Sequence, residues 1–276
     1  MLNDAFHCSV DLVVNSYERT FRTVLAPGFF PDIVAQNRRS FARKIALINN
    51  VDNKQEAKDL ADRLIVRGEI DAYYFVEDYL PQALNIAGLT TQDLGRLPHY
   101  SDCSLVAVTL PGGPYLLYWD AEVRLQKPAN WVDPSLELME SDKRILAANP
   151  NWQKPTLARE TLAKAGEFAI GYGFSDQMFL VRKNDLARPI YNCRCLASLR
   201  NPFAHVAAVF EQRVDAFMRT HRRLRATYMD ATYEHLEKDG AAYAPNDWRE
   251  RSRQIRNRTL VAVLKRLPTE NPCFKV

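Results

Sequence analysis

Short apolar runs alternate with amphipathic stretches through the first half of this chain. Runs rich in β-branched and aromatic residues predict buried strands, and apolar residues three and four positions apart predict helices. We predict strands at 10–15, 44–49, 72–76 and 115–120, helices at 32–39, 54–67 and 81–89, and a helix or buried segment at 101–110. This alternation predicts an α/β fold with a mostly parallel central sheet covered by helices.

The second half has a different pattern. After Pro202, apolar residues recur at helical spacing toward His235, which predicts one long helix, and 248–267 predicts another. Before them, the segment 168–181 has the pattern of a polar loop that leads into a strand, with Asp176 at the junction.

Polar clusters follow three of the predicted strands, at 15–19, 49–53 and 120–122. Ligands bind beyond the carboxyl ends of the strands in open sheets of this kind. We therefore expect the three clusters to converge on one cleft at that edge.

The third cluster carries two carboxylates, Asp120 and Glu122, directly after an apolar strand. Residues two apart on a strand share a face, so both side chains would point the same way if the strand geometry persists. Two such acids repel each other unless a cation lies between them. The pattern predicts a site for a divalent metal with a phosphate as its other partner. The alternative is a helix N-cap or a solvated loop end.

Length and composition exclude little. The chain has 276 residues, enough for one large domain or two small ones, and its net charge of +4 does not demand nucleic acid as a partner. No apolar run approaches the roughly 20 residues that span a bilayer, and the first residues lack the pattern of a signal peptide. The five cysteines, an odd number, favour reduced thiols and a cytoplasmic location.

Other candidate residues each have a structural alternative. The segment from Asn15 to Arg19 has no glycine-rich phosphate loop, so it would contact a base and ribose or form a simple turn. Asp176 would accept a proton from a bound acceptor hydroxyl or cap a loop. His235 is the histidine that we favour as a further metal ligand, because a chain end can fold back over a site; its alternative is a core or surface residue.

These residues together resemble a GT-A fold glycosyltransferase. The opening strand ends in Val13-Val14-Asn15-Ser16-Tyr17-Glu18-Arg19, the second strand is followed by Asp52, and Asp120-Ala121-Glu122 is a variant of the Asp-x-Asp motif. Asp176 matches a downstream acid that often serves as the base in inverting members. The resemblance covers about residues 10–185. It departs from the family where Glu122 replaces the last Asp, and where Ser175-Asp176-Gln177 replaces the usual Glu-Asp pair.

The resemblance implies a GT-A type fold, with a catalytic domain at 1–200 that binds a nucleotide sugar and a helical C-terminal extension at 201–276. It implies transfer of a sugar from a nucleotide-diphosphate donor to an acceptor hydroxyl, on a glycan or another compound, with inversion. Mn²⁺ or Mg²⁺ would be held by Asp120 and Glu122, with His235 as the further candidate, and Asp176 would be the base. The nucleotide sugar would be held by Asn15, Ser16, Tyr17, Glu18, Arg19, Asp52 and Asp120.

Two other functions fit the same pattern. A nucleotidyltransferase also uses paired carboxylates and a divalent ion, but it usually needs a glycine-rich or basic first loop for the triphosphate. A non-catalytic protein that binds carbohydrate or a partner would fold in the same way without metal-dependent turnover.

Overall fold

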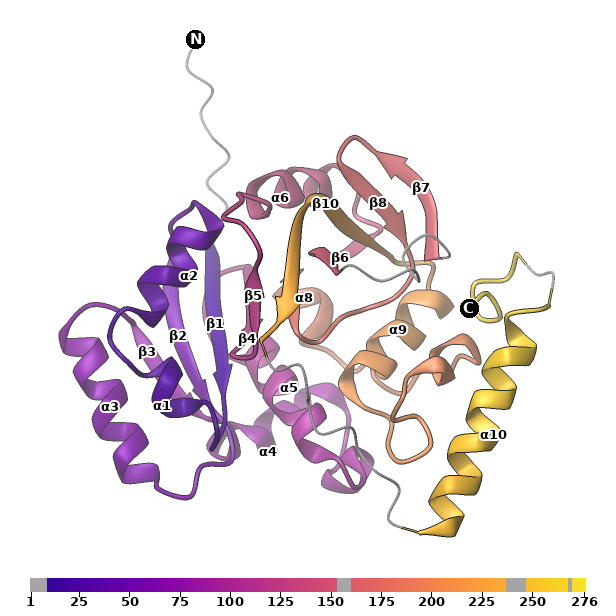
Figure 1. Cartoon of the computed structure of the whole chain (residues 1–276), viewed down its shortest axis with the longest axis horizontal. Helices are drawn as coiled ribbons and strands as arrows, with labels where there is room; N and C mark the ends of the chain where they lie inside the picture. The colour runs from indigo at the N-terminus through magenta and orange to yellow at the C-terminus, as the bar shows by residue number, and fades with distance from the viewer. Residues whose placement is uncertain (1–8, 153–159, 237–246, 268–269) are drawn as a thin grey trace.

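The computed structural model describes residues 9–152, 160–236, 247–267 and 270–276. Within these ranges the chain forms one ten-stranded mixed sheet with helices on both faces (Figure 1). The strands are β1 Val10–Ser16, β2 Arg43–Ile48, β3 Ala72–Phe75, β4 Tyr115–Asp120, β5 Val123–Leu125, β6 Ile145–Trp152, β7 Thr161–Ala165, β8 Phe168–Gly171, β9 Met178–Arg182 and β10 Leu224–His235. The α-helices are α1 Phe21–Val24, α2 Phe29–Asn37, α3 Lys54–Val66, α4 Val76–Ala87, α5 Asp102–Thr109, α6 Val132–Ser141, α8 Lys183–Leu186, α9 Phe210–Thr220 and α10 Trp248–Leu264, and short 3₁₀ turns lie at Thr91–Leu94, Pro98–Tyr100 and Ala197–Arg200.

The sheet runs in the order β3-β2-β1-β4-β9-β6-β10-β8-β7, and β5 pairs with β10 off this path. Strands β3, β2, β1 and β4 are parallel neighbours. Strand β9 lies antiparallel between β4 and β6, and β10 runs parallel to β6. The predicted α/β class, with a mostly parallel core sheet and flanking helices, is confirmed.

The central strands are apolar along their whole length because both faces of the sheet are covered. In β4, Leu117 and Trp119 belong to the core beneath α2, α3 and α6. Their neighbours Leu116 and Tyr118 belong to the core beneath α4, α5 and α9. All four side chains are at most 1% exposed, so the run ends only where the chain leaves the sheet, at Asp120.

The prediction of one long helix after Pro202 is wrong. Helix α9 ends at Thr220, and Arg222 adopts a left-handed φ of 51°, which a continuing helix does not allow. The following residues, which include Thr227, Tyr228 and Tyr233, have high β propensity and form β10 between β6 and β8. Strands β6 and β8 pair with the first part of β10 from its two sides, so tertiary context overrides the helical spacing.

The C-terminal segment is consequently more than a helical extension. Residues 201–276 supply β10 to the interior of the sheet, in addition to α9 and the outlying helix α10 (Figure 1). Among the described helices, none combines the length and the apolar composition that crossing a membrane requires.

Candidate active site

The carboxyl ends of β1 and β4 bring two predicted site residues side by side. Asn15 and Asp120 are register partners in these parallel strands. The Asn15 Nδ2 donates to Asp120 Oδ2 over 3.5 Å, while Asn15 Oδ1 is buried and has no hydrogen-bond partner within the described ranges. The sheet thus holds an amide and a carboxylate at one point of its edge.

The Asp-Ala-Glu segment is a turn, so the expectation that strand geometry continues to Glu122 is wrong. Strand β4 ends at Asp120, and the Glu122 N–H donates to Asp120 Oδ1 over 2.9 Å. The Trp119 Nε1 donates to the Val123 carbonyl over 3.0 Å and ties the two sides of the turn together. The turn, rather than a shared strand face, keeps the two carboxylates close.

Glu122 is fixed by two other predicted site residues. The Tyr17 hydroxyl donates to Glu122 Oε1, and His235 Nε2 lies 3.4 Å from Glu122 Oε2. His235 reaches this position because it pairs with Val123 at the end of β10. The structure therefore brings His235 to the carboxylates, as predicted, but from a strand and not from a helix.

Asp176 comes from the antiparallel neighbour of β4. It lies just before β9, and the Asp120 N–H donates to the carbonyl of the adjacent Gln177 over 2.8 Å. Asp176 is half-buried and lies at the same edge of the sheet as Asp120. Three strands, β1, β4 and β9, thus deliver Asn15, Asp120 and Asp176 to one place.

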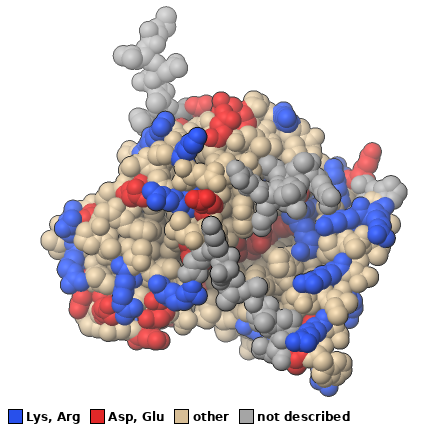
Figure 2. All heavy atoms as spheres, viewed as in Figure 1, with Lys and Arg blue, Asp and Glu red and all other residues tan. Residues whose placement is uncertain are grey.

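The site is electrostatically unfavourable without a cation. Burial raises the pKa of Asp120 to about 6, and the charge of Glu122 contributes in the same direction. Burial also raises the pKa of Asp176 to about 6, with the charge of Asp120 as the second cause. Clustered carboxylates with raised pKa values favour protonation or a bound cation. Figure 2 shows acidic atoms in a recess near the middle of the face seen in Figure 1.

The predicted nucleotide-binding residues surround the ends of β1 and β2. Glu18 Oε2 accepts from the Asp52 N–H over 2.8 Å, which joins the two loops, and both Asp52 and Arg19 are exposed. Ser16 is fully buried and donates to the Leu47 carbonyl over 3.2 Å. The two loops thus form one rim beside Tyr17, with Ser16 beneath it in the sheet.

Polar residues at the start of α5 complete this rim, and the sequence analysis did not single them out. Asn49 Nδ2 donates to Asp102 Oδ1 over 2.9 Å, and His99 Nδ1 lies 3.3 Å from Asp102 Oδ2. Burial raises the pKa of Tyr100, which follows His99 in the chain, and the charges of Asp176 and Glu122 act in the same direction. A polar run before an apolar helix is the only local signal for these residues.

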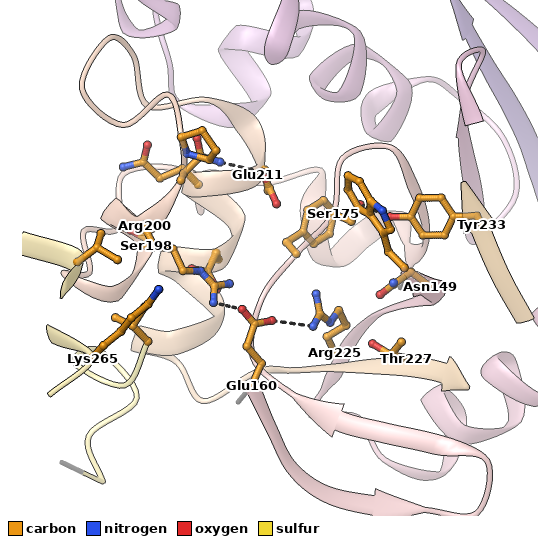
Figure 3. A pocket seen from close by; sticks show the side chains of 18 residues that line it. Asn149, Glu160, Ser175, Ser198, Arg200, Glu211, Arg225, Thr227, Tyr233 and Lys265 are labelled. Atoms are coloured by element: carbon orange, nitrogen blue, oxygen red, sulfur yellow. Dashed lines mark hydrogen bonds and ion pairs between the residues drawn. The ribbon is translucent and has the colours of Figure 1, made fainter. Parts of the chain in front are cut away.

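A cavity of about 300 Å³ is lined by Asn149 of β6, Thr227 of β10 and Gln212 of α9, among other residues (Figure 3). Ser175 lines it and lies 3.0 Å, oxygen to oxygen, from the Tyr233 hydroxyl. Within it, Glu160 accepts from both Arg200 and Arg225 (Figure 3). The sequence analysis missed this cavity, because its residues come from segments far apart in the chain.

No protein-family model and no curated protein matches the chain. Solved glycosyltransferase structures are similar to it at low identity. A structure of GalNAc-T7 with UDP, GalNAc and Mn²⁺ is 10% identical with a TM-score of 0.48, over 87% of this chain and 45% of that one. Glucosyl-3-phosphoglycerate synthase from Mycobacterium tuberculosis, in complex with Mn²⁺, UDP and phosphoglyceric acid, is 12% identical with a TM-score of 0.44, over 96% and 81%. Mouse xyloside xylosyltransferase 1 in its apo form is 12% identical with a TM-score of 0.45, over 79% and 84%. These similarities are distant, and function is therefore inferred from the site itself.

Proposed function

We propose that this protein is a metal-dependent glycosyltransferase that moves a sugar from a nucleotide-diphosphate donor to an acceptor hydroxyl with inversion. The observation that carries the proposal is the convergence of Asp120, Glu122 and Asp176 at the carboxyl edge of a mixed sheet. The rim formed by the loops at 17–20 and 49–53 lies beside these carboxylates and would take the nucleotide.

The side chains at this edge suit Mn²⁺ or Mg²⁺. Within the described residues no group of three or more His, Cys, Asp or Glu side chains is arranged to hold a metal ion by itself. These ions commonly bind one or two carboxylates and complete their coordination with water and substrate phosphate, so a full cage is not needed. Asp120, Glu122 and His235 would hold the ion, and the unpartnered Asn15 Oδ1 is a further oxygen at the same point. A bound ion would neutralise charge on the diphosphate leaving group.

Asp176 would be the general base. A carboxyl whose pKa is raised to about 6 is ionised at neutral pH and is closer to the operating pH than an ordinary aspartate. It would take the proton of the acceptor hydroxyl as the new bond to the sugar anomeric carbon forms. The bond from that carbon to the diphosphate oxygen breaks on the opposite face, which gives inversion. Tyr17 and His235 would hold Glu122 in place during this displacement.

Turnover of nucleotide sugars tests the proposal. The protein is incubated with a panel of nucleotide sugars, acceptors and Mn²⁺, and release of nucleoside diphosphate is measured. We expect turnover that chelation abolishes, that Asp120→Asn removes, and that Asp176→Asn lowers by about 10²-fold or more. Asp59→Asn, at an exposed position of α3, is the matched control and should keep full activity.

Other outcomes would assign a different function. Release of pyrophosphate from a nucleoside triphosphate, without turnover of any diphosphate sugar, would identify a nucleotidyltransferase. Ligand binding that needs no metal and survives Asp120→Asn, without turnover, would identify a non-catalytic binding protein.

A further inference from the structure

The cavity beside Asp176 is built by side chains that face the same way from neighbouring strands. Thr227 of β10 and Asn149 of β6 are register partners, and Arg225 lies two residues before Thr227 on the same face. Gln212 of α9 lines the cavity from another side. All four are among the residues that line the cavity.

Each of these four residues carries a buried polar atom without a hydrogen-bond partner in the described part of the chain. The atoms are Asn149 Oδ1, Gln212 Oε1, Arg225 Nε and Thr227 Oγ1. Leaving such atoms unpaired destabilises the folded protein, so their concentration at one cavity needs an explanation. The amide oxygens of Asn149 and Gln212 can each accept a hydrogen bond, and the Arg225 Nε–H can donate one. The Thr227 hydroxyl can do either.

The charges at the cavity favour an anion. Glu160 is held by Arg200 and Arg225, and Asp215 by Arg219 and Arg200, while Lys265 also lines the cavity. The side chains that line the cavity thus include three basic groups, Arg200, Arg225 and Lys265, against the two carboxylates of Glu160 and Asp215, an excess of one.

Glu211 does not cancel this excess at neutral pH. Burial raises its pKa to about 8, and the charge of Asp176 acts in the same direction. It is therefore mostly protonated at pH 7, and its Oε2 accepts from Asn201 Nδ2 over 2.7 Å.

Aromatic side chains form another part of the wall. Trp152 and Tyr233 are register partners on β6 and β10, and their rings lie 5.5 Å apart, centroid to centroid. Phe174 lines the cavity as well, next to Ser175. Rings beside polar groups of both kinds suit a ligand that has hydroxyls on a hydrocarbon frame.

We propose that this cavity binds the acceptor, and that the acceptor is a hydroxylated acid such as a sugar acid or sugar phosphate. This rests on the proposed function. Two ligand hydroxyls would donate to Asn149 and Gln212, and the ligand's carboxylate or phosphate would accept from Arg225. A further hydroxyl would then lie toward Asp176, one residue from the cavity-lining Ser175.

Direct binding without donor or metal tests the proposal apart from turnover. Glucuronate, glucose 6-phosphate and the neutral control glucose are titrated into the full-length protein by calorimetry. We expect at least one acid to bind about tenfold or more tightly than glucose, as a charged hydrogen bond predicts. An oligosaccharide that ends in glucuronate, compared with free glucuronate, shows whether the acid is a free compound or the end of a glycan. Equal or undetectable binding of all three small probes would overturn the proposal.

Two near-isosteric substitutions separate a binding role from a structural one. Gln212→Met and Thr227→Val remove polar atoms that folding leaves unpaired, so thermal stability should stay the same or rise. Binding of the acid should weaken by about tenfold for each variant. Arg256→Gln, at an exposed position of α10, should change neither property. Lower stability of the two variants with unchanged binding would overturn the proposal.

Failure of the two proposals can be told apart. Asp120→Asn should still bind the acid, because Asp120 does not line the cavity. Acid binding without any sugar transfer would refute the proposed function alone. Transfer to neutral acceptors by a protein that does not prefer the acid would refute the acceptor assignment alone.

Discussion

At the scale of single residues, two acidic side chains of this site lower the stability of the folded protein when they ionise. Asp120 and Asp176 are carboxyls whose pKa is raised by burial, and each is also affected by a neighbouring acid. Such an arrangement destabilises the folded state when the groups ionise, and sites that act on charged ligands commonly show it. The protein keeps two unfavourable negative charges where a bound cation would offset them.

Asp176→Asn should stabilise the metal-free protein at pH 8. The folded pKa of about 6 lies above the ordinary 3.8, so this group favours folding below about pH 4 and loses that contribution as the pH rises through 6. Removing the charge should therefore raise the free energy of unfolding by roughly 1–3 kcal/mol at pH 8, and much less at pH 4. Urea unfolding at the two pH values measures this. A destabilised variant at pH 8 would show that the carboxylate holds the fold together.

His235→Ala should weaken Mn²⁺ binding by about tenfold or more, because Glu122 loses the partner at its Oε2 or the ion loses a ligand. Calorimetric titration with Mn²⁺ measures the change. His221→Ala is the matched control, since His221 is exposed beyond the end of α9, near Cys193. Equal affinity in wild type and His235→Ala would assign His235 a structural role.

Residues at strand ends were predictable from sequence, whereas residues paired across the fold were not. Asp120 and Asn15 each follow an apolar run, and the end of such a run marks the edge of a sheet. Glu160 and Arg225 are 65 residues apart and meet only in the folded chain. No local spacing distinguishes them from surface charges.

At the scale of elements, the alternating first half was predictable and the β10 region was not. Helix α3 follows its apolar spacing and is capped by Asn53, whose side chain accepts from the Glu56 N–H over 3.0 Å. In β10 the spacing of apolar residues also fits a helix. The segment forms a strand because its backbone can pair with β6 on one side and with β8 on the other. The local sequence pattern does not predict secondary structure correctly where strands distant in the chain supply the backbone hydrogen bonds.

A chain truncated after residue 200 should not fold cooperatively. It would lack β10, and β6 and β8 would lose the strand that separates them in the sheet. A chain truncated after residue 236 keeps every strand of the sheet and should unfold cooperatively at lower stability, because only α10 and the terminal segment are removed. Near-ultraviolet circular dichroism and urea unfolding compare the two. Native-like signals from the shorter chain would show that residues 1–200 fold without β10 and would contradict this prediction.

At the scale of the whole molecule, the sheet arranges three regions in a row. The rim at β1 and β2 lies on one side of the carboxylates, and the cavity lined by Asn149, Arg225 and Gln212 lies on the other. The carboxylates between them would hold the metal ion, which in turn would bind the reacting diphosphate. The proposed donor, metal and acceptor regions would thus follow the strand order, with β4 and β9 at the centre.

The coupling of metal to nucleotide tests this account most directly. UDP and GDP are titrated calorimetrically into wild type and Asp120→Asn, each with and without Mn²⁺. The account predicts that at least one nucleotide binds wild type tightly only with Mn²⁺, and that Asp120→Asn loses this binding in spite of an unchanged fold. Nucleotide binding of equal strength in both proteins without Mn²⁺, or the absence of any nucleotide binding, would contradict it.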